Sequence, residues 1–129
     1  MRRLSSGQVL GAFLLGAGVS HFAVPGFYDR IVPHALPGPE RAWTYVSGVA
    51  ELAVGTAVLR PATRSRGALV AAALFLAVFP ANVQQAVDAS SAQEKLISYA
   101  RLPLQVPLLV WAVRVSRAAG RRGWPSPAR

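Results

Sequence analysis

The sequence predicts an all-α integral membrane protein: a four-helix bundle, both termini cytoplasmic, with a short interfacial segment between helices 1 and 2. Hydrophobic residues make up 53% of the 129 residues, and charged residues make up 15%. The charges are unevenly distributed, since residues 4–28, 67–87 and 102–113 hold none and residues 42–59 hold only Glu51. A helix needs about 20 residues to cross a hydrocarbon core about 30 Å thick. Stretches of this length and composition therefore predict membrane-spanning helices.

Four spans are predicted, the last of them interrupted by two prolines. They cover about residues 7–24, 42–59, 67–87 and 97–115. Together they form one transmembrane domain, residues 1–116, and residues 117–129 have the basic composition of a disordered cytoplasmic tail. The connection at residues 25–40 contains four prolines, which exclude a long helix. Its aromatic residues Phe27 and Tyr28 suit a segment lying flat at the depth of the lipid headgroups.

The basic residues predict the orientation. Ten of the 14 Lys and Arg residues lie at the N-terminus, between the second and third spans, or after the fourth span. Cytoplasmic loops carry the Lys/Arg excess, so both termini are predicted to be cytoplasmic. Anionic lipid of the bilayer is the expected partner of these arginines, and nucleic acid is not, because no nucleic-acid reading element is recognisable. A cleaved secretory signal at residues 1–20 is disfavoured because three more apolar segments follow.

Polar side chains from all four spans are predicted to meet in the outer half of the bundle. Helical geometry puts His21 on a face with small residues and puts Glu51 in a small-and-polar stripe with Ser47. Helical rise and the lean of side chains toward helix N-termini bring the polar groups toward one layer. The predicted polar or ligand-binding cluster comprises His21, Ser47, Glu51, Asn82, Arg101 and Gln105.

Glu51 is the centre of this prediction. A charged carboxylate at such depth is costly unless it is paired or wet, so Glu51 is expected to be protonated, or paired with Arg101 or a protonated His21. The cluster is either a functional site or a set of structural polar contacts that holds the helices in register. A metal site is not expected, because the chain has no cysteine and only two histidines, which lie far apart in the sequence. No catalytic residue is identified, since no nucleophile–base pair appears.

Four segments together resemble the DoxX-like family of small four-helix bacterial membrane proteins. They are GVSHFAVPGFYDRIVPHALP (18–37), YVSGVAELAVGTAVLRPATR (45–64), VFPANV (78–83) and RLPLQVPLLVWA (101–112). The resemblance spans about residues 7–116. It implies a four-helix bundle in the bacterial inner membrane, and it implies relatives that are linked to redox systems, among them a membrane subunit of a thiosulfate:quinone oxidoreductase. Thiol chemistry cannot reside in this chain, because it has no cysteine.

Three functions are compatible with these residues. The first is a quinone-binding or accessory membrane subunit of a redox system, with a redox partner subunit, in which Glu51 and His21 manage protons and Phe75 and Phe79 line a slot beside Asn82. The second is a structural scaffold. The third is a small proton-coupled transporter, working as a homo-oligomer, whose moving parts are kinks at its prolines. Whether the chain is an enzyme stays open at this point.

Overall fold

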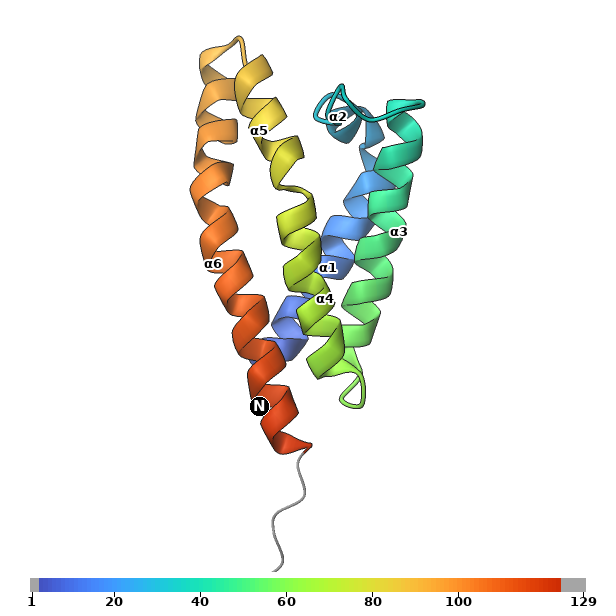
Figure 1. Ribbon diagram of the computed structural model, residues 1–129, viewed down its shortest axis with the longest axis vertical. Coiled ribbons are helices and arrows are strands. Elements are labelled where there is room, and N and C mark those ends of the chain that lie inside the picture. The colour runs from blue at the N-terminus through green and yellow to red at the C-terminus, as the bar shows by residue number, and fades with distance from the viewer. Residues whose placement is uncertain (1–2, 124–129) are drawn as a thin grey trace, which may run out of the picture.

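The computed structural model of the chain is all-helical across residues 3–123, the part that it describes (Figure 1). Six helices follow one another, and no strand occurs within these residues. They are α1 (Ser6–Ala23), α2 (Pro25–Asp29), α3 (Glu40–Leu59), α4 (Arg64–Ala77), α5 (Phe79–Asp88) and α6 (Ala92–Arg122). The prediction of an all-α protein is therefore confirmed.

Local sequence signals explain where the helices begin and break. Ser5 and Ser91 each accept a hydrogen bond from the backbone three residues on, in capping boxes that start α1 and α6. Pro25 occupies the first turn of α2, where its missing N–H costs no hydrogen bond. Pro80 divides the predicted third span, because α4 ends at Ala77 and α5 begins after a break at Val78.

Three of the helical stretches are long and apolar enough to cross a membrane by length and composition. They are Glu40–Leu59, Arg64–Asp88 and Ala92–Arg122. Each contains one of the predicted spans. The first predicted span corresponds to α1, which has 18 residues and is not among the three. Pro103 and Pro107 lie inside the continuous helix α6, so the fourth predicted span is not broken there.

The end of α6 corrects the predicted tail. Residues 117–122, predicted to be disordered, continue the helix to Arg122. Arginine and alanine are among the best helix formers, and they dominate this segment despite Gly120. The rest of the predicted tail, residues 124–129, lies outside the described residues.

The packing order places α1 against α3, α3 against α4, and α4 against α6, with α5 on α6 and α2 on α3 (Figure 1). The hydrophobic core lies between the long helices. Its fully buried members are Leu10, Leu14, Val58, Ala68, Ala71 and Ala112. Many large apolar side chains face outward instead, for example Val46 and Leu76, each 60% exposed. An apolar exterior is the arrangement expected of helices whose surroundings are lipid.

Glycines let α1 and α3 approach closely. A Cβ atom on Gly18 would lie 3.0 Å from the carbonyl oxygen of Gly48, and one on Gly55 would lie 3.0 Å from that of Gly11. Real Cβ atoms rarely come so near backbone atoms, so larger residues here would push the helices apart. The predicted small-residue face of the first span is therefore the contact with α3, and His21 on that face is 7% exposed.

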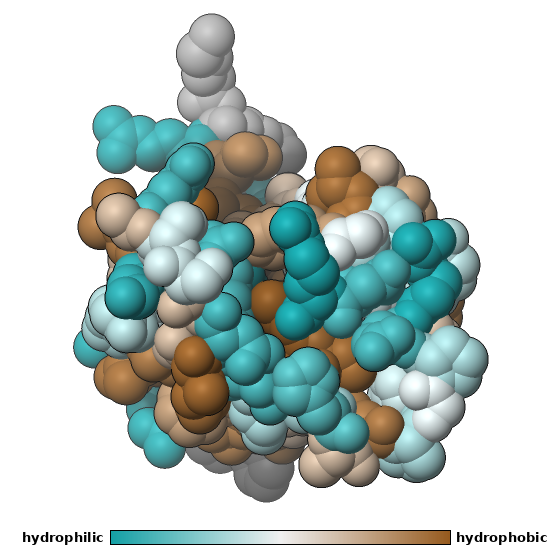
Figure 2. Space-filling model, turned by 90° about the horizontal axis from the view of Figure 1, so that it is seen from above, coloured by the Kyte–Doolittle hydropathy of each residue, from teal (hydrophilic) through white to brown (hydrophobic). Residues whose placement is uncertain are grey.

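Charge divides the molecule into two ends. The α2 end contains α2 and the turn between α5 and α6, and hydrophilic side chains gather on it between apolar ones (Figure 2). The arginine end contains the start of α1, the turn between α3 and α4, and the end of α6. Its arginines are Arg3, Arg60, Arg64, Arg66, Arg114, Arg117, Arg121 and Arg122.

Candidate functional site

A buried pair of titratable side chains joins α1 to α3. His21 Nδ1 lies 3.1 Å from Glu51 Oε2, and the two side chains are 9% and 13% exposed. His21 lies one turn beyond Gly18, and Glu51 lies one turn beyond Gly48, so the close glycine contact brings the pair together. The predicted approach of these two residues is present in the structure.

His21 Nδ1 also has a backbone acceptor within reach, the carbonyl group of Ala17. Nδ1 lies 2.8 Å from the carbonyl oxygen of Ala17, and a carbonyl can only accept, so Nδ1 is the donor in that bond. Although Glu51 Oε2 is close enough for an ion pair, it has no hydrogen-bond partner within residues 3–123 and is buried. A buried polar atom without a partner costs about 1–3 kcal/mol, so Oε2 is ready to hold a proton or accept from a ligand.

The helix α2 covers the histidine. The Tyr28 ring stacks on the His21 ring, with centroids 3.6 Å apart and an interplanar angle of 16°. The Tyr28 hydroxyl also hydrogen-bonds to Ser20 Oγ. The helix α1 ends just before Pro25, and α2 starts at Pro25. The chain therefore folds back over His21, near the end of α1. Tyr28 thus fixes the plane of the imidazole and shields one of its faces.

Asp29 holds α2 in this position. Its Oδ1 accepts a hydrogen bond of 2.7 Å from Thr44 Oγ1, and its Oδ2 accepts one of 2.8 Å from Arg41 Nε. The bond from Thr44, and after it the bond and charge of Arg41, hold the pKa of Asp29 below its ordinary value. Thr44 is 2% exposed, so this tie joins the short helix to the buried face of α3.

Arg101 reaches toward the pair from α6. Its Nη1 donates a hydrogen bond of 3.1 Å to Gln85 Oε1, and its guanidinium lies 5.8 Å from the centroid of the Phe27 ring. It is near enough to His21 for its charge to act on the imidazole. No ion pair joins Arg101 to Glu51 within residues 3–123, so the predicted pairing of Glu51 is made with His21 alone.

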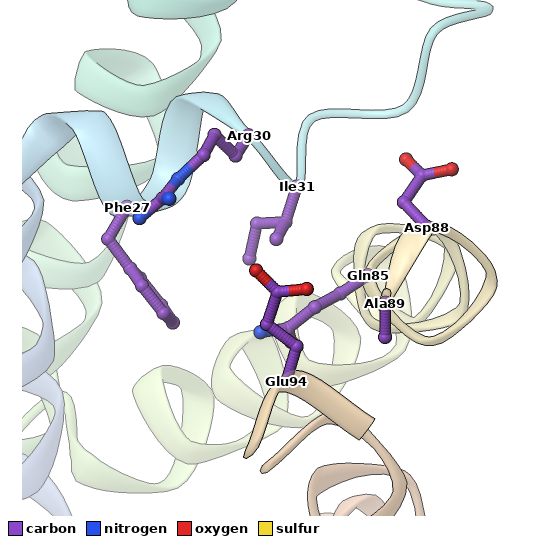
Figure 3. A pocket seen from close by; sticks show the side chains of 7 residues that line it. All are labelled: Phe27, Arg30, Ile31, Gln85, Asp88, Ala89 and Glu94. Carbon is purple, nitrogen blue, oxygen red and sulfur yellow. The ribbon is translucent and has the colours of Figure 1, made fainter. Parts of the chain in front are cut away.

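A pocket of about 200 Å³ opens beside Arg101 at the α2 end (Figure 3). Phe27 and Ile31 line it from the α2 side, and Gln85 and Glu94 line it from the α5–α6 side. Figure 3 shows the Phe27 ring and the Glu94 carboxylate directed into the shared space, whereas the Asp88 carboxylate points away. Arg101 contacts two of the lining residues, Phe27 and Gln85, but does not line the pocket itself.

The other predicted cluster residues are Asn82, Ser47 and Gln105. Asn82 is buried, at 3% exposed, and Ser47 and Gln105 are half-buried. Among residues 3–123, no side-chain hydrogen bond connects any of these three to His21 or Glu51. The two rings of the predicted slot differ in exposure, since Phe75 is 6% exposed in the core and Phe79 is 45% exposed. The break at Val78 turns the two rings away from a common face.

Sequence reasoning missed three residues that complete the site. Tyr28 was assigned to the membrane interface, Gln85 was not among the cluster residues, and Phe27 was not connected to Arg101. Tyr28 follows His21 by seven residues across Pro25, and this spacing is a signal of a chain that folds back. Nothing in the sequence pairs Gln85 with Arg101, because that contact depends on how α5 packs on α6.

The site offers proton-active and hydrogen-bonding groups rather than metal ligands. No group of three or more His, Cys, Asp or Glu side chains able to hold a metal occurs within the described residues. The buried pair can exchange a proton, and Arg101 can donate to a carbonyl or carboxylate oxygen.

Comparison with known proteins places the chain in a family without assigning it an activity. Residues 10–116 match the family described as Domain of unknown function (DUF8561), and this range includes the buried pair, α2 and Arg101. No curated protein and no solved structure matches the chain. Because the match covers most of the sequence, the chain belongs to the DUF8561 family.

Proposed function

We propose that the chain is a four-span protein of the bacterial inner membrane that binds a quinone-like carrier and handles its protons. In this proposal α1, α3, the α4–α5 pair and α6 each cross the bilayer, and both termini are cytoplasmic. The apolar exterior and the gathering of arginines at one end support that topology. The α2 end then faces outward, and α2 lies at the interface over the buried pair.

The observation that carries the proposal is the unpartnered Oε2 atom of Glu51 beside His21. Ionisable groups inside a membrane bundle are expensive, and they usually mark proton or substrate pathways. A quinone gains protons when it is reduced, so its site needs a nearby proton donor and a donor to its carbonyl oxygen. Glu51 with His21 can meet the first need, and Arg101 can meet the second.

The resemblance to DoxX-like proteins supports the same proposal. Three motifs carry this resemblance: the H-F-x-x-P-x-x-Y pattern, the glutamate of the second span, and R-x-P-L-Q. They include His21, Tyr28, Glu51 and Arg101. Of these four residues, Tyr28 and Glu51 lie directly against the imidazole of His21. A role as the membrane subunit of a redox system, with a separate electron-transferring partner, follows from that resemblance.

The test is quinone binding by the purified protein. Protein in neutral detergent is titrated with short-chain ubiquinone and menaquinone, and binding is followed by native mass spectrometry and thermal melts. The wild type is expected to bind one quinone, and Glu51→Gln and His21→Ala are expected to weaken binding by about tenfold, as the loss of one buried hydrogen bond implies. Thr56→Ala serves as the control, since Thr56 is exposed on α3 and bonds only to its own backbone. Absence of binding by the wild type would end the proposal.

A scaffold is the second candidate, and one observation favours it. The pair lies within the α1–α3 contact, and neither residue lines the pocket at the α2 end. A scaffold predicts that Glu51→Gln lowers the melting temperature and leaves growth and redox phenotypes unchanged. Thermal melts beside a complementation assay in a deletion strain therefore separate the two functions.

A further inference from the structure

A second cavity opens at the arginine end, away from the buried pair. Its volume is about 230 Å³, and it lies between the start of α1, the start of α4 and the last turns of α6. Arg64, Arg114 and Arg122 bring positive charge to it, and the small residues Gly7 and Ala118 leave its space open. Ligand sites for whole cofactors measure about 300–1,000 Å³, so this cavity suits a small group.

The charge at this end has no internal counterpart. The chain has five Asp and Glu residues, of which Glu51 lies in the middle of α3 and the other four lie in or beside the turns of the α2 end. No ion pair within residues 3–123 involves Arg64, Arg114 or Arg122. Arg64 instead donates to the carbonyl oxygens of Val58 and Leu59. Within residues 3–123, therefore, no acidic side chain offsets the positive charge of the cavity.

The walls of the cavity are tied together. Trp111 Nε1 donates a hydrogen bond of 2.8 Å to Ser6 Oγ, which joins the start of α1 to α6. Ser65 and Ser116 exchange bonds of 2.9 and 2.8 Å between each hydroxyl and the other residue's carbonyl, which join α4 to α6. The space is thus held open by fixed helices, and an anion could enter it without a rearrangement of the backbone.

We propose that this cavity binds the phosphate of an anionic phospholipid headgroup. Guanidinium groups match phosphate oxygens in bidentate geometry, and the first-turn N–H groups of α1 add further donors. A lipid is favoured over a free phosphate because exposed apolar side chains border the site: Leu4, next to the lining residue Ser5, is 70% exposed. The headgroup would occupy the cavity while the acyl chains lie along the apolar flank. This inference depends on membrane insertion and is independent of quinone binding.

Native mass spectrometry with two defined lipids tests the site. Protein delipidated in neutral detergent is titrated with phosphatidylglycerol or with phosphatidylcholine, and parallel samples contain millimolar inorganic phosphate. The wild type is expected to bind one phosphatidylglycerol at least about tenfold more tightly than phosphatidylcholine, because each arginine near an anionic headgroup contributes about 1 kcal/mol. Inorganic phosphate is expected not to displace the lipid.

Matched variants separate the cavity from general surface charge. Arg114→Gln with Arg122→Gln removes two cavity charges, and Arg66→Gln with Arg117→Gln removes two charges at the same end outside the cavity. The first pair is expected to weaken phosphatidylglycerol binding by about tenfold or more, and the second by less than about threefold. Ala118→Phe fills the cavity without changing charge and is expected to weaken binding as well. Thermal melts establish that each variant is folded.

Three results would overturn the proposal. Equal losses in the two arginine pairs would assign the binding to a diffuse basic surface. Unaltered binding in folded Ala118→Phe would show that the cavity is not the site. Displacement of the lipid by inorganic phosphate would make the ligand a free phosphate instead of a lipid headgroup.

Discussion

The two ends of the molecule differ in how their charged side chains are paired. At the α2 end, carboxylates find partners inside the chain: Asp29 binds Arg41 at 2.8 Å, and Asp88 binds His34 at 3.2 Å. At the arginine end, eight arginines stand without any Asp or Glu beside them. The α2 end is therefore held by its own polar contacts, and it positions a site. The arginine end lacks acidic side chains, and it contains the cavity for which we propose a lipid headgroup.

Breaking the internal contacts of the α2 end should have the largest effect. Asp29→Ala leaves the buried hydroxyl of Thr44 without its acceptor, which we expect to cost about 2 kcal/mol and to loosen α2 over His21. Thermal unfolding in neutral detergent measures the loss. Asp88→Ala is the control, because the Asp88 side chain is 42% exposed and its partner His34 is 69% exposed. Equal losses in the two variants would contradict a special role for Asp29.

At the arginine end, Arg64 is bound to the end of α3, and the removal of its side chain should have a smaller effect. Arg64 donates bonds of 2.8 and 2.9 Å to the carbonyl oxygens of Val58 and Leu59 at the end of α3. Arg64→Ala is expected to lower stability by about 1 kcal/mol, since cations at a helix C-terminus contribute about that amount. Arg64→Lys keeps the charge and should recover part of the loss. Full stability of Arg64→Ala would show that this arginine, like its neighbours, acts only outward.

The architecture was predictable because lipid imposes strong constraints on sequence. Charge-poor segments of about 20 residues located each long helix, and the small residues of the first span located its contact face. The division at Val78 was partly predictable, since Pro80 marked it. The helical end of α6 was not predicted, because a basic composition describes disorder and an arginine-rich helix equally well.

The candidate site was predictable only where helical geometry determines contacts. His21 and Glu51 meet because glycines on both helices fix the distance and rotation of α1 against α3. The predicted cluster of six residues is incomplete. The positions of Asn82 and Gln105 depend on the tilt of α5 and α6, which periodicity does not give, and Ser47 on α3 makes no side-chain hydrogen bond to the pair among the described residues. Tyr28 joined the site through a short helix whose direction is set by Asp29 and Thr44, two residues that are 15 positions apart.

The pH dependence of stability should report on the contacts of Asp29 at the α2 end. The pKa of Asp29 in the folded protein lies below its ordinary value of 3.8, so the unfolded chain binds the proton more readily. The stabilisation by its ionised form is complete above that ordinary value and is lost as the pH falls through the lower folded value. The melting temperatures of wild type and Asp29→Asn should therefore differ most at pH 5–7 and converge as the pH falls below 3.8 and through the lower folded value. A constant difference across this range would exclude the carboxylate charge as the cause.

The salt dependence of the melting temperature should show the smallest of the expected differences between the two ends. Arg117 stands three residues after Arg114 and four before Arg121 on α6, and like charges at these spacings repel weakly. Arg117→Gln is expected to raise the melting temperature by about 1 °C in neutral detergent at low salt, and to have no effect at about 1 M salt, where screening acts within about 3 Å. Arg41→Gln, which removes a paired charge at the α2 end, is expected to lower the melting temperature, more at low salt than at high salt. If Arg117→Gln instead destabilises the protein in detergent, the arginine end has an internal partner, and the contrast between the ends is wrong. Added phosphatidylglycerol should abolish the gain from Arg117→Gln, because the anionic surface already offsets the repulsion.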